Sequence, residues 1–145
     1  MATFAIVETD WSRDAPRLGA VRRAVFVDEQ GVPEALEWDE HDAASIHWLA
    51  ASDDGTPIGC ARLLPDGHIG RMAVLPGWRG RGVGRALLAA VVRTAKLRGH
   101  ATLRLSAQTH AAAFYAQAGF VAVGEEYEEA GIAHVAMQKY LVGPD

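Results

Sequence analysis

The chain has 145 residues, half of them apolar, and a formal net charge of −4 at pH 7. This length and composition predict one domain over residues 1–145, and the mild negative charge argues against a globally basic nucleic-acid binder. The single cysteine, Cys60, excludes an intramolecular disulfide and a cysteine-rich zinc site, and it favours a reducing, cytoplasmic location. No apolar run approaches the roughly 18–20 residues of a membrane span, so we expect no membrane partner.

The N-terminal half predicts a strand, two helices and a meander. Residues 3–8 alternate as a first strand does, and they lack the basic start of a signal peptide. Residues 14–30 predict a helix capped by Asp14, because apolar residues recur there at three-to-four spacing. A shorter acidic stretch to about residue 42 predicts a second helix. The meander follows, with strands predicted over 46–52, 57–64 and 68–75.

The C-terminal half predicts a long helix that ends at about Arg98, then a strand over 101–107 and a short helix over 110–119. Two final strands are predicted over 120–127 and 132–140. The order is β-α-α-β-β-β-α-β-α-β-β. It indicates a mixed α/β (α+β) domain around one sheet, in which an antiparallel meander meets a crossover unit.

The segment RGRGVGRALL, residues 79–88, joins a strand to the long helix through a glycine-rich turn. Such a turn is typical of an anion site, because unpaired first-turn N–H groups and the helix dipole converge there. A Walker A loop is excluded, since Val83 and Gly84 stand where Lys and Ser/Thr belong. The dinucleotide fingerprint is excluded too, since Arg85 and Leu87 occupy the positions of its last glycine.

The pattern that fits is Arg-x-x-Gly-x-Gly at Arg79, Gly82 and Gly84. It resembles the pyrophosphate loop of the GNAT superfamily of N-acetyltransferases, which binds acetyl-CoA. The flanking segments IGRMAVLPGWRGRGVG, LRLSAQ and AAFYAQAGF resemble that superfamily in the same order, over nearly the whole chain. FVDEQGVPEALEWDEHD, AQTHAAAFY and GIAHVAM further resemble its ElaA-like bacterial branch. The resemblance implies the GNAT acyltransferase fold, whose central sheet splays open beside the strand that precedes the loop.

The resemblance also implies where the acyl donor binds. Backbone N–H groups of the loop would hold the pyrophosphate, and the edge of the preceding strand would hold the pantetheine arm. The Val74 amide would then stabilise the oxyanion. The implied coenzyme-binding residues are Met72, Ala73, Val74, Arg79, Gly80, Arg81, Gly82, Val83, Gly84, Arg85, Gln108 and Phe114.

The implied catalytic groups are Tyr115, Glu29 and His134. Tyr115 would be the general acid, because the resemblance places this tyrosine beside the coenzyme sulfur and a phenol can protonate a thiolate. Its neighbour Phe114 is expected to pack the short helix. The general base stays open between Glu29, at the end of the first helix, and His134, on an apolar strand where a hydrogen-bonded core histidine is the common alternative.

The function implied is acetyl-CoA-dependent transfer of an acetyl group to a primary amine, directly, in a ternary complex without a metal. Residues 24–61 carry acids but no Lys or Arg, residues 67–124 show the reverse, and GEEYEE follows at 124–129. This segregation predicts a basic coenzyme side and an acidic side for a cationic small-molecule amine. The alternative is a coenzyme-binding module without turnover. A nucleic-acid module built on residues 71–104 lacks interleaved aromatics, and a homodimer stays open.

Overall fold

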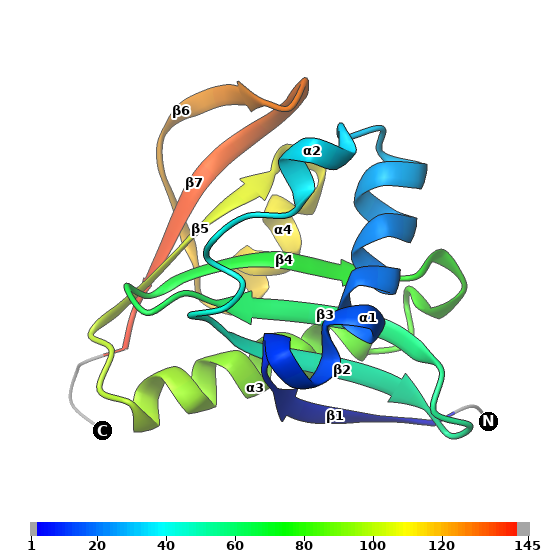
Figure 1. The fold of residues 1–145 in the computed structure, drawn as a ribbon. Coiled ribbons are helices and arrows are strands. Elements are labelled where there is room, and N and C mark those ends of the chain that lie inside the picture. The colour runs from blue at the N-terminus through cyan, green and yellow to red at the C-terminus, as the bar shows by residue number, and fades with distance from the viewer. Residues whose placement is uncertain (1–2, 142–145) are drawn as a thin grey trace.

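The computed structural model describes residues 3–141, which form one seven-stranded sheet in the order β1-β2-β3-β4-β5-β7-β6 (Figure 1). All neighbours are antiparallel except β4 and β5. None of the helices within these residues is long and apolar enough to cross a membrane. The strands are β1 Phe4–Thr9, β2 Ile46–Ser52, β3 Pro57–Leu63, β4 His68–Val74, β5 Thr102–Gln108, β6 Val121–Glu129 and β7 Ile132–Tyr140. The helices are α1 Trp11–Arg22, α2 Glu34–Glu37, α3 Val83–Leu97 and α4 Ala112–Gln117.

The predicted order of elements is confirmed, but the first helix differs in its detail. It begins at Trp11, and Asp10 caps it by accepting a hydrogen bond from the Arg13 amide at 2.8 Å. Asp14, the predicted cap, instead sits at a kink with φ −127° and ψ 22°. The cap prediction was therefore wrong by one turn, because two acids four residues apart both precede helical sequence and only tertiary contacts select one. The acidic second helix is also shorter than predicted.

The first helix ends in a π-helical segment, Arg23–Glu29, which the sequence pattern did not predict. The Gln30 amide donates to the Val25 carbonyl at 3.0 Å, five residues back. This wider turn shifts the following residues around the helix axis relative to an α-helix. Such π-turns are common at functional sites, and this one directs Glu29 and Gln30 toward the middle of the sheet.

The sheet opens in its middle, as the resemblance implied. β4 and β5 pair in parallel only at His68–Arg104 and Ile69–Leu105, after which the two strands diverge. Figure 1 shows β5 and the β6–β7 hairpin turning away from the β1–β4 half. The C-terminal part of β4, beyond Ile69, therefore has an edge without a paired strand, and a binding site can form at this opening.

Helices cover both faces of the sheet. On one face, Leu18, Val21 and Val25 of the first helical region pack against Leu49 and Cys60. On the other face, α3 buries its apolar stripe, which consists of Val83, Leu87, Leu88, Val91 and Ala95. Burial raises the pKa of the Cys60 thiol to about 12, so this cysteine is a small hydrophobic core residue.

Candidate active site

The glycine loop has the geometry of an anion site. Gly82 caps α3 with a φ of 86°, in the left-handed region that favours glycine. The first helical bond runs from the Ala86 amide to the Gly82 carbonyl at 3.0 Å, so the amides of Val83, Gly84 and Arg85 have no carbonyl one turn back to bind. A Cβ built at Gly80 or Gly82 meets no atom within 4 Å, which leaves the space in front of these amides open.

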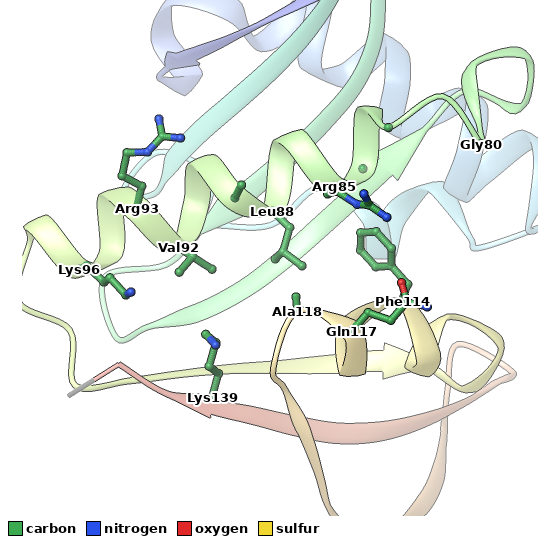
Figure 2. Close-up of a pocket in the computed structure, with 13 residues that line it drawn as sticks. Gly80, Arg85, Leu88, Val92, Arg93, Lys96, Phe114, Gln117, Ala118 and Lys139 are labelled. Atoms are coloured by element: carbon green, nitrogen blue, oxygen red, sulfur yellow. The ribbon is translucent and has the colours of Figure 1, made fainter. Parts of the chain in front are cut away.

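An outer cavity of about 950 Å³ begins at this loop and runs along α3 (Figure 2). Its lining includes the basic side chains of Arg85, Arg93, Lys96 and Lys139. Figure 2 shows Lys139 on β7 facing the helix that carries Lys96. Among the described residues no carboxylate lines it, so its charge favours an anionic ligand longer than a single phosphate.

An inner cavity of about 910 Å³ lies where β4 and β5 diverge. It shares Gly80, Gly84 and Phe114 with the outer cavity, so the two meet at the glycine loop. A Cβ at Gly84 would lie 3.3 Å from the Phe114 ring, which shows how closely α3 and α4 approach at this junction. The arrangement gives one continuous path from the basic outer surface to the centre of the sheet.

The unpaired edge of β4 supplies main-chain groups to the inner cavity. The Leu75 amide donates to Ile58 of β3 at 2.9 Å. Because successive residues of a strand direct their N–H groups to opposite sides, the Val74 amide points away from β3, toward the opening. The Val74 carbonyl, on that same side, accepts a hydrogen bond from Arg79 Nε at 2.9 Å.

Tyr115 projects from α4 toward the same edge. Its hydroxyl lies 3.6 Å from the Met72 Sδ, and its ring packs edge-on against Phe114 and Phe120. Burial raises the pKa of this phenol to about 12, so the hydroxyl stays protonated at neutral pH. Tyr115 can therefore donate a proton within the inner cavity, beside the strand edge that carries Val74.

Glu29 reaches the inner cavity as an ion pair. Its carboxylate oxygens accept hydrogen bonds from Arg79 at 2.8 and 2.7 Å, and these bonds lower the pKa of Glu29. A lowered pKa makes Glu29 a weaker base. Because Arg79 also binds the Val74 carbonyl, its guanidinium connects the loop, β4 and the first helix rather than presenting a free charge to an anion.

His134 lies on β7, with only 7% of its surface exposed. Its Nδ1 is 2.7 Å from the Ile132 carbonyl oxygen, an acceptor, so Nδ1 carries the proton and Nε2 of the neutral ring holds a free lone pair. Nε2 lies 3.9 Å from a Glu129 oxygen, and the ring stacks on Tyr127. His134 is thus oriented to accept a proton at Nε2. Of the other predicted residues, Gln108 is tied to Gln30 by reciprocal amide hydrogen bonds of 2.8 and 3.1 Å.

The acidic side differs from the sequence-based expectation, because arginines neutralise much of it. Arg22 binds Glu37 at 2.9 Å and Asp42 at 2.7 Å, and Arg62 binds Asp42 at 3.0 Å. Arg62 also binds Asp39 at 2.8 Å, and Arg71 binds both Glu37 and Asp39. The inner cavity is consequently lined by Arg62, Arg71 and Arg79 as well as by Glu29, Glu37 and Glu129. Of the GEEYEE segment, only Glu129 reaches it.

Sequence reasoning missed Arg62 and Arg71 as lining residues of the inner cavity. The sequence contained one indication of the role of Arg62. Arg62 follows Ile58 and Cys60 at alternate positions, in a strand whose other residues are almost all apolar, and a charge there needs a buried partner. Arg71 carries a positive φ of 49° at a strand irregularity, which no sequence pattern revealed.

Comparison with known proteins agrees with this geometry. The Acetyltransferase (GNAT) domain family matches residues 9–141. The uncharacterised N-acetyltransferase YjcF of Bacillus subtilis is 37% identical over 123 residues, which cover 82% of this chain and 87% of the relative. ElaA of Escherichia coli is 32% identical over 130 residues, 84% of each chain.

The fold also matches solved structures of this kind. The crystal structure of an acyl-CoA N-acyltransferase from Pseudomonas aeruginosa superposes with a TM-score of 0.84 at 31% identity, covering 94% of this chain and 99% of that one. The glycine loop and the opened sheet thus occur in a chain that resembles such proteins along nearly its whole length. The chain belongs to the GNAT acetyltransferase family, which typically uses acyl-CoA donors.

Proposed function

We propose that this protein transfers the acetyl group of acetyl-CoA to a primary amine, directly and in a ternary complex. The observation that carries the proposal is the continuous path between the two cavities. It begins among basic side chains, passes the free amides of the glycine loop and ends at the unpaired edge of β4. Acetyl-CoA is a long anionic thioester, which matches the shape and charge of that path.

Different residues suit different parts of the coenzyme. The amides of Val83, Gly84 and Arg85 suit the pyrophosphate, because a helix N-terminus favours anions. Lys96 and Lys139 suit the phosphate at the adenosine end. The Val74 N–H is available to the thioester oxygen, where negative charge develops as the amine attacks.

The chemistry needs two proton transfers. The amine nitrogen forms a bond to the carbonyl carbon of the thioester and gives up a proton. His134 Nε2 is better placed to accept this proton than Glu29, because the Glu29 carboxylate is paired with Arg79. The carbon–sulfur bond then breaks, and the departing thiolate takes a proton from the Tyr115 hydroxyl. The products are an N-acetyl amine and free coenzyme A. General acid–base groups of this kind typically contribute about 10²–10⁴-fold each.

A screen of primary amines with acetyl-CoA, read as release of free thiol, tests the proposal. We expect at least one amine class to release thiol well above the hydrolysis background, with a rate that rises with pH as amine and base lose their protons. Tyr115→Phe measured in parallel separates catalysis from contaminating activity. Tight coenzyme binding without amine-dependent thiol release at any pH would instead identify a coenzyme-binding module.

A further inference from the structure

One cation of the inner cavity is incompletely paired. The side chain of Arg62 is 6% exposed, and its Nη1 donates to Asp39 at 2.8 Å and to Asp42 at 3.0 Å. Its Nε is buried and has no hydrogen-bond partner within residues 3–141. Arg62 Nη2 also donates no hydrogen bond to any residue between 3 and 141. The unpaired atoms form one edge of the guanidinium, which is the edge that binds carboxylates with two parallel hydrogen bonds.

The residue of β4 that lies beside this edge is a glycine. Arg62 on β3 pairs with Gly70 on β4, and a Cβ built at Gly70 would lie 3.7 Å from Arg62 Nη2. Both residues line the inner cavity, together with Ser106 and His134 across the opening. A buried N–H of a charged group without a partner is costly in free energy, and native structures contain few of them. The free edge of Arg62 therefore indicates a ligand group that completes it.

The surrounding charge indicates what that group is. Arg22, Arg62 and Arg71 face Glu37, Asp39 and Asp42, so the cluster around the free edge is balanced. A planar monoanion with two oxygens matches the two donors. A phosphate dianion would place more negative charge beside Asp39 and Asp42, which disfavours it.

We propose that the acceptor is a primary amine that also carries a carboxylate, and that the Nε and Nη2 of Arg62 bind this carboxylate while the amine faces His134. The inference rests on the proposed acetyl transfer and specifies its acceptor. It differs from the cationic amine that the charge segregation of the sequence favours, because arginines of α1, β3 and β4 neutralise the acidic segment.

Matched pairs of acceptors test the proposal. A series of ω-amino acids, from glycine to 6-aminohexanoate, is compared with the corresponding amides at saturating acetyl-CoA. For the chain length that spans the cavity, we expect kcat/KM for the acid to exceed that for the amide by about tenfold or more, since a site with unpaired buried donors rejects a ligand that leaves them unpaired. Equal values, or a preference for the amides, would overturn it.

Gly70→Ala is the sharpest variant, because its methyl group would sit in ordinary contact with Arg62 Nη2 without steric strain and cover the free edge. It should raise KM for the acids by a larger factor than KM for the amides, and leave the acetyl-CoA thermal shift unchanged. Gly19→Ala is the matched control. Its Cβ would also make its closest contact at 3.7 Å, with Trp38, away from the cavity. If Gly70→Ala affects acids and amides alike, the carboxylate does not bind this edge.

A binding measurement separates this proposal from the proposed function. The Nε–H resonance of Arg62 in the ¹⁵N-labelled protein should shift when the preferred ω-amino acid is added, and not when its amide is added. A shift without acetylation of either ligand would retain the carboxylate site and overturn acetyl transfer to that acceptor. Acetylation of the acid without any shift of this resonance would retain acetyl transfer and overturn the role of Arg62.

Discussion

The outer and inner ends of the cleft differ in composition: backbone groups dominate the outer end, and ion-paired side chains dominate the inner end. The proposed coenzyme end consists of backbone amides at the start of α3, glycines that leave space in front of them, and basic side chains along α3 and on β7. The proposed acceptor end consists of side chains from β3, β4, β5, β7 and the region between α1 and β2, and ion pairs between residues up to 50 positions apart hold it together.

This difference decides how each end tolerates change. A backbone-built anion site depends on a few conformations and on empty space, so a single added side chain blocks it. A side-chain-built pocket depends on a shared network, so removal of one partner leaves an uncompensated buried charge and weakens the fold itself. We therefore test the coenzyme end with glycine substitutions and the acceptor end with variants that keep shape.

The largest effect is expected at the residue between the two ends. Tyr115→Phe keeps the ring that packs against Phe114 and Phe120 and removes only the proton donor. Turnover should fall by roughly 10²–10⁴, while the acetyl-CoA thermal shift is retained. Tyr140→Phe, at an exposed site on β7, is the control and should leave turnover unchanged. Full activity of a folded Tyr115→Phe would assign the tyrosine to packing alone.

The next effect distinguishes the two candidate bases at the acceptor end. His134→Gln should lower kcat by about 10²-fold, the lower part of the range for one proton-transfer group, because Nε2 no longer accepts a proton. Glu29→Gln should have the smaller effect on kcat, since its carboxylate is engaged by Arg79. The pH dependence of kcat/KM for both variants is the measurement. A larger loss in Glu29→Gln, with His134→Gln close to wild type, would reverse the assignment.

The third prediction concerns the coenzyme end. Gly82→Val places a side chain in front of the α3 amides, and Gly99→Val is its matched control. The two glycines have φ values of 86° and 84°, both built Cβ atoms meet nothing within 4 Å, and they lie at opposite ends of α3. Both variants should lose stability through backbone strain, by about 1–2 kcal/mol.

Only Gly82→Val should lose the stabilisation by acetyl-CoA, which is about 2.7 kcal/mol at a hundredfold excess over Kd. Thermal unfolding of both variants with and without acetyl-CoA is the measurement. An equal ligand shift in the two variants would show that the glycine loop is only a turn.

The smallest effect is a pH dependence of stability. The native pKa of Tyr115 is about 12, whereas its ordinary value is 10, so the unfolded chain loses this proton first as the pH rises. The free energy of unfolding should therefore decline between pH 10 and 12 through this group, and be unaffected by it below pH 10. Comparison of wild type with Tyr115→Phe by chemical denaturation isolates the contribution. Parallel curves through that range would place the phenol in contact with water.

The comparison of the two ends also explains what the sequence could predict. The order of elements and the glycine loop were predictable from the residues, because strand alternation, helix periodicity and the Arg-x-x-Gly-x-Gly spacing are local. The opening beside β4 was expected only from the family resemblance. The sequence predicted only part of the role of Arg79. Its position in the loop was clear, but its ion pair with Glu29 joins residues 50 positions apart.

At the proposed acceptor end, the sequence did not reveal the charge of the cavity. Several residues between Phe26 and Glu37 line the inner cavity, and His134 lines it too. The acidity of that segment suggested a cationic ligand, whereas the fold brings Arg22, Arg62 and Arg71 onto the same carboxylates. Charge pairing between elements that are far apart in the sequence follows from tertiary structure, and the π-helical turn that directs Gln30 inward has no composition signal.

The central claim is direct transfer within one continuous cleft, and initial rates with both substrates varied test it most directly. Free thiol and N-acetyl amine are quantified together, by absorbance and by mass spectrometry. We predict that the two products appear one to one, that double-reciprocal plots intersect as a ternary complex requires, and that the protein gains no acetyl mass. Parallel lines with an acetylated protein, or thiol released without N-acetyl amine, would contradict the account.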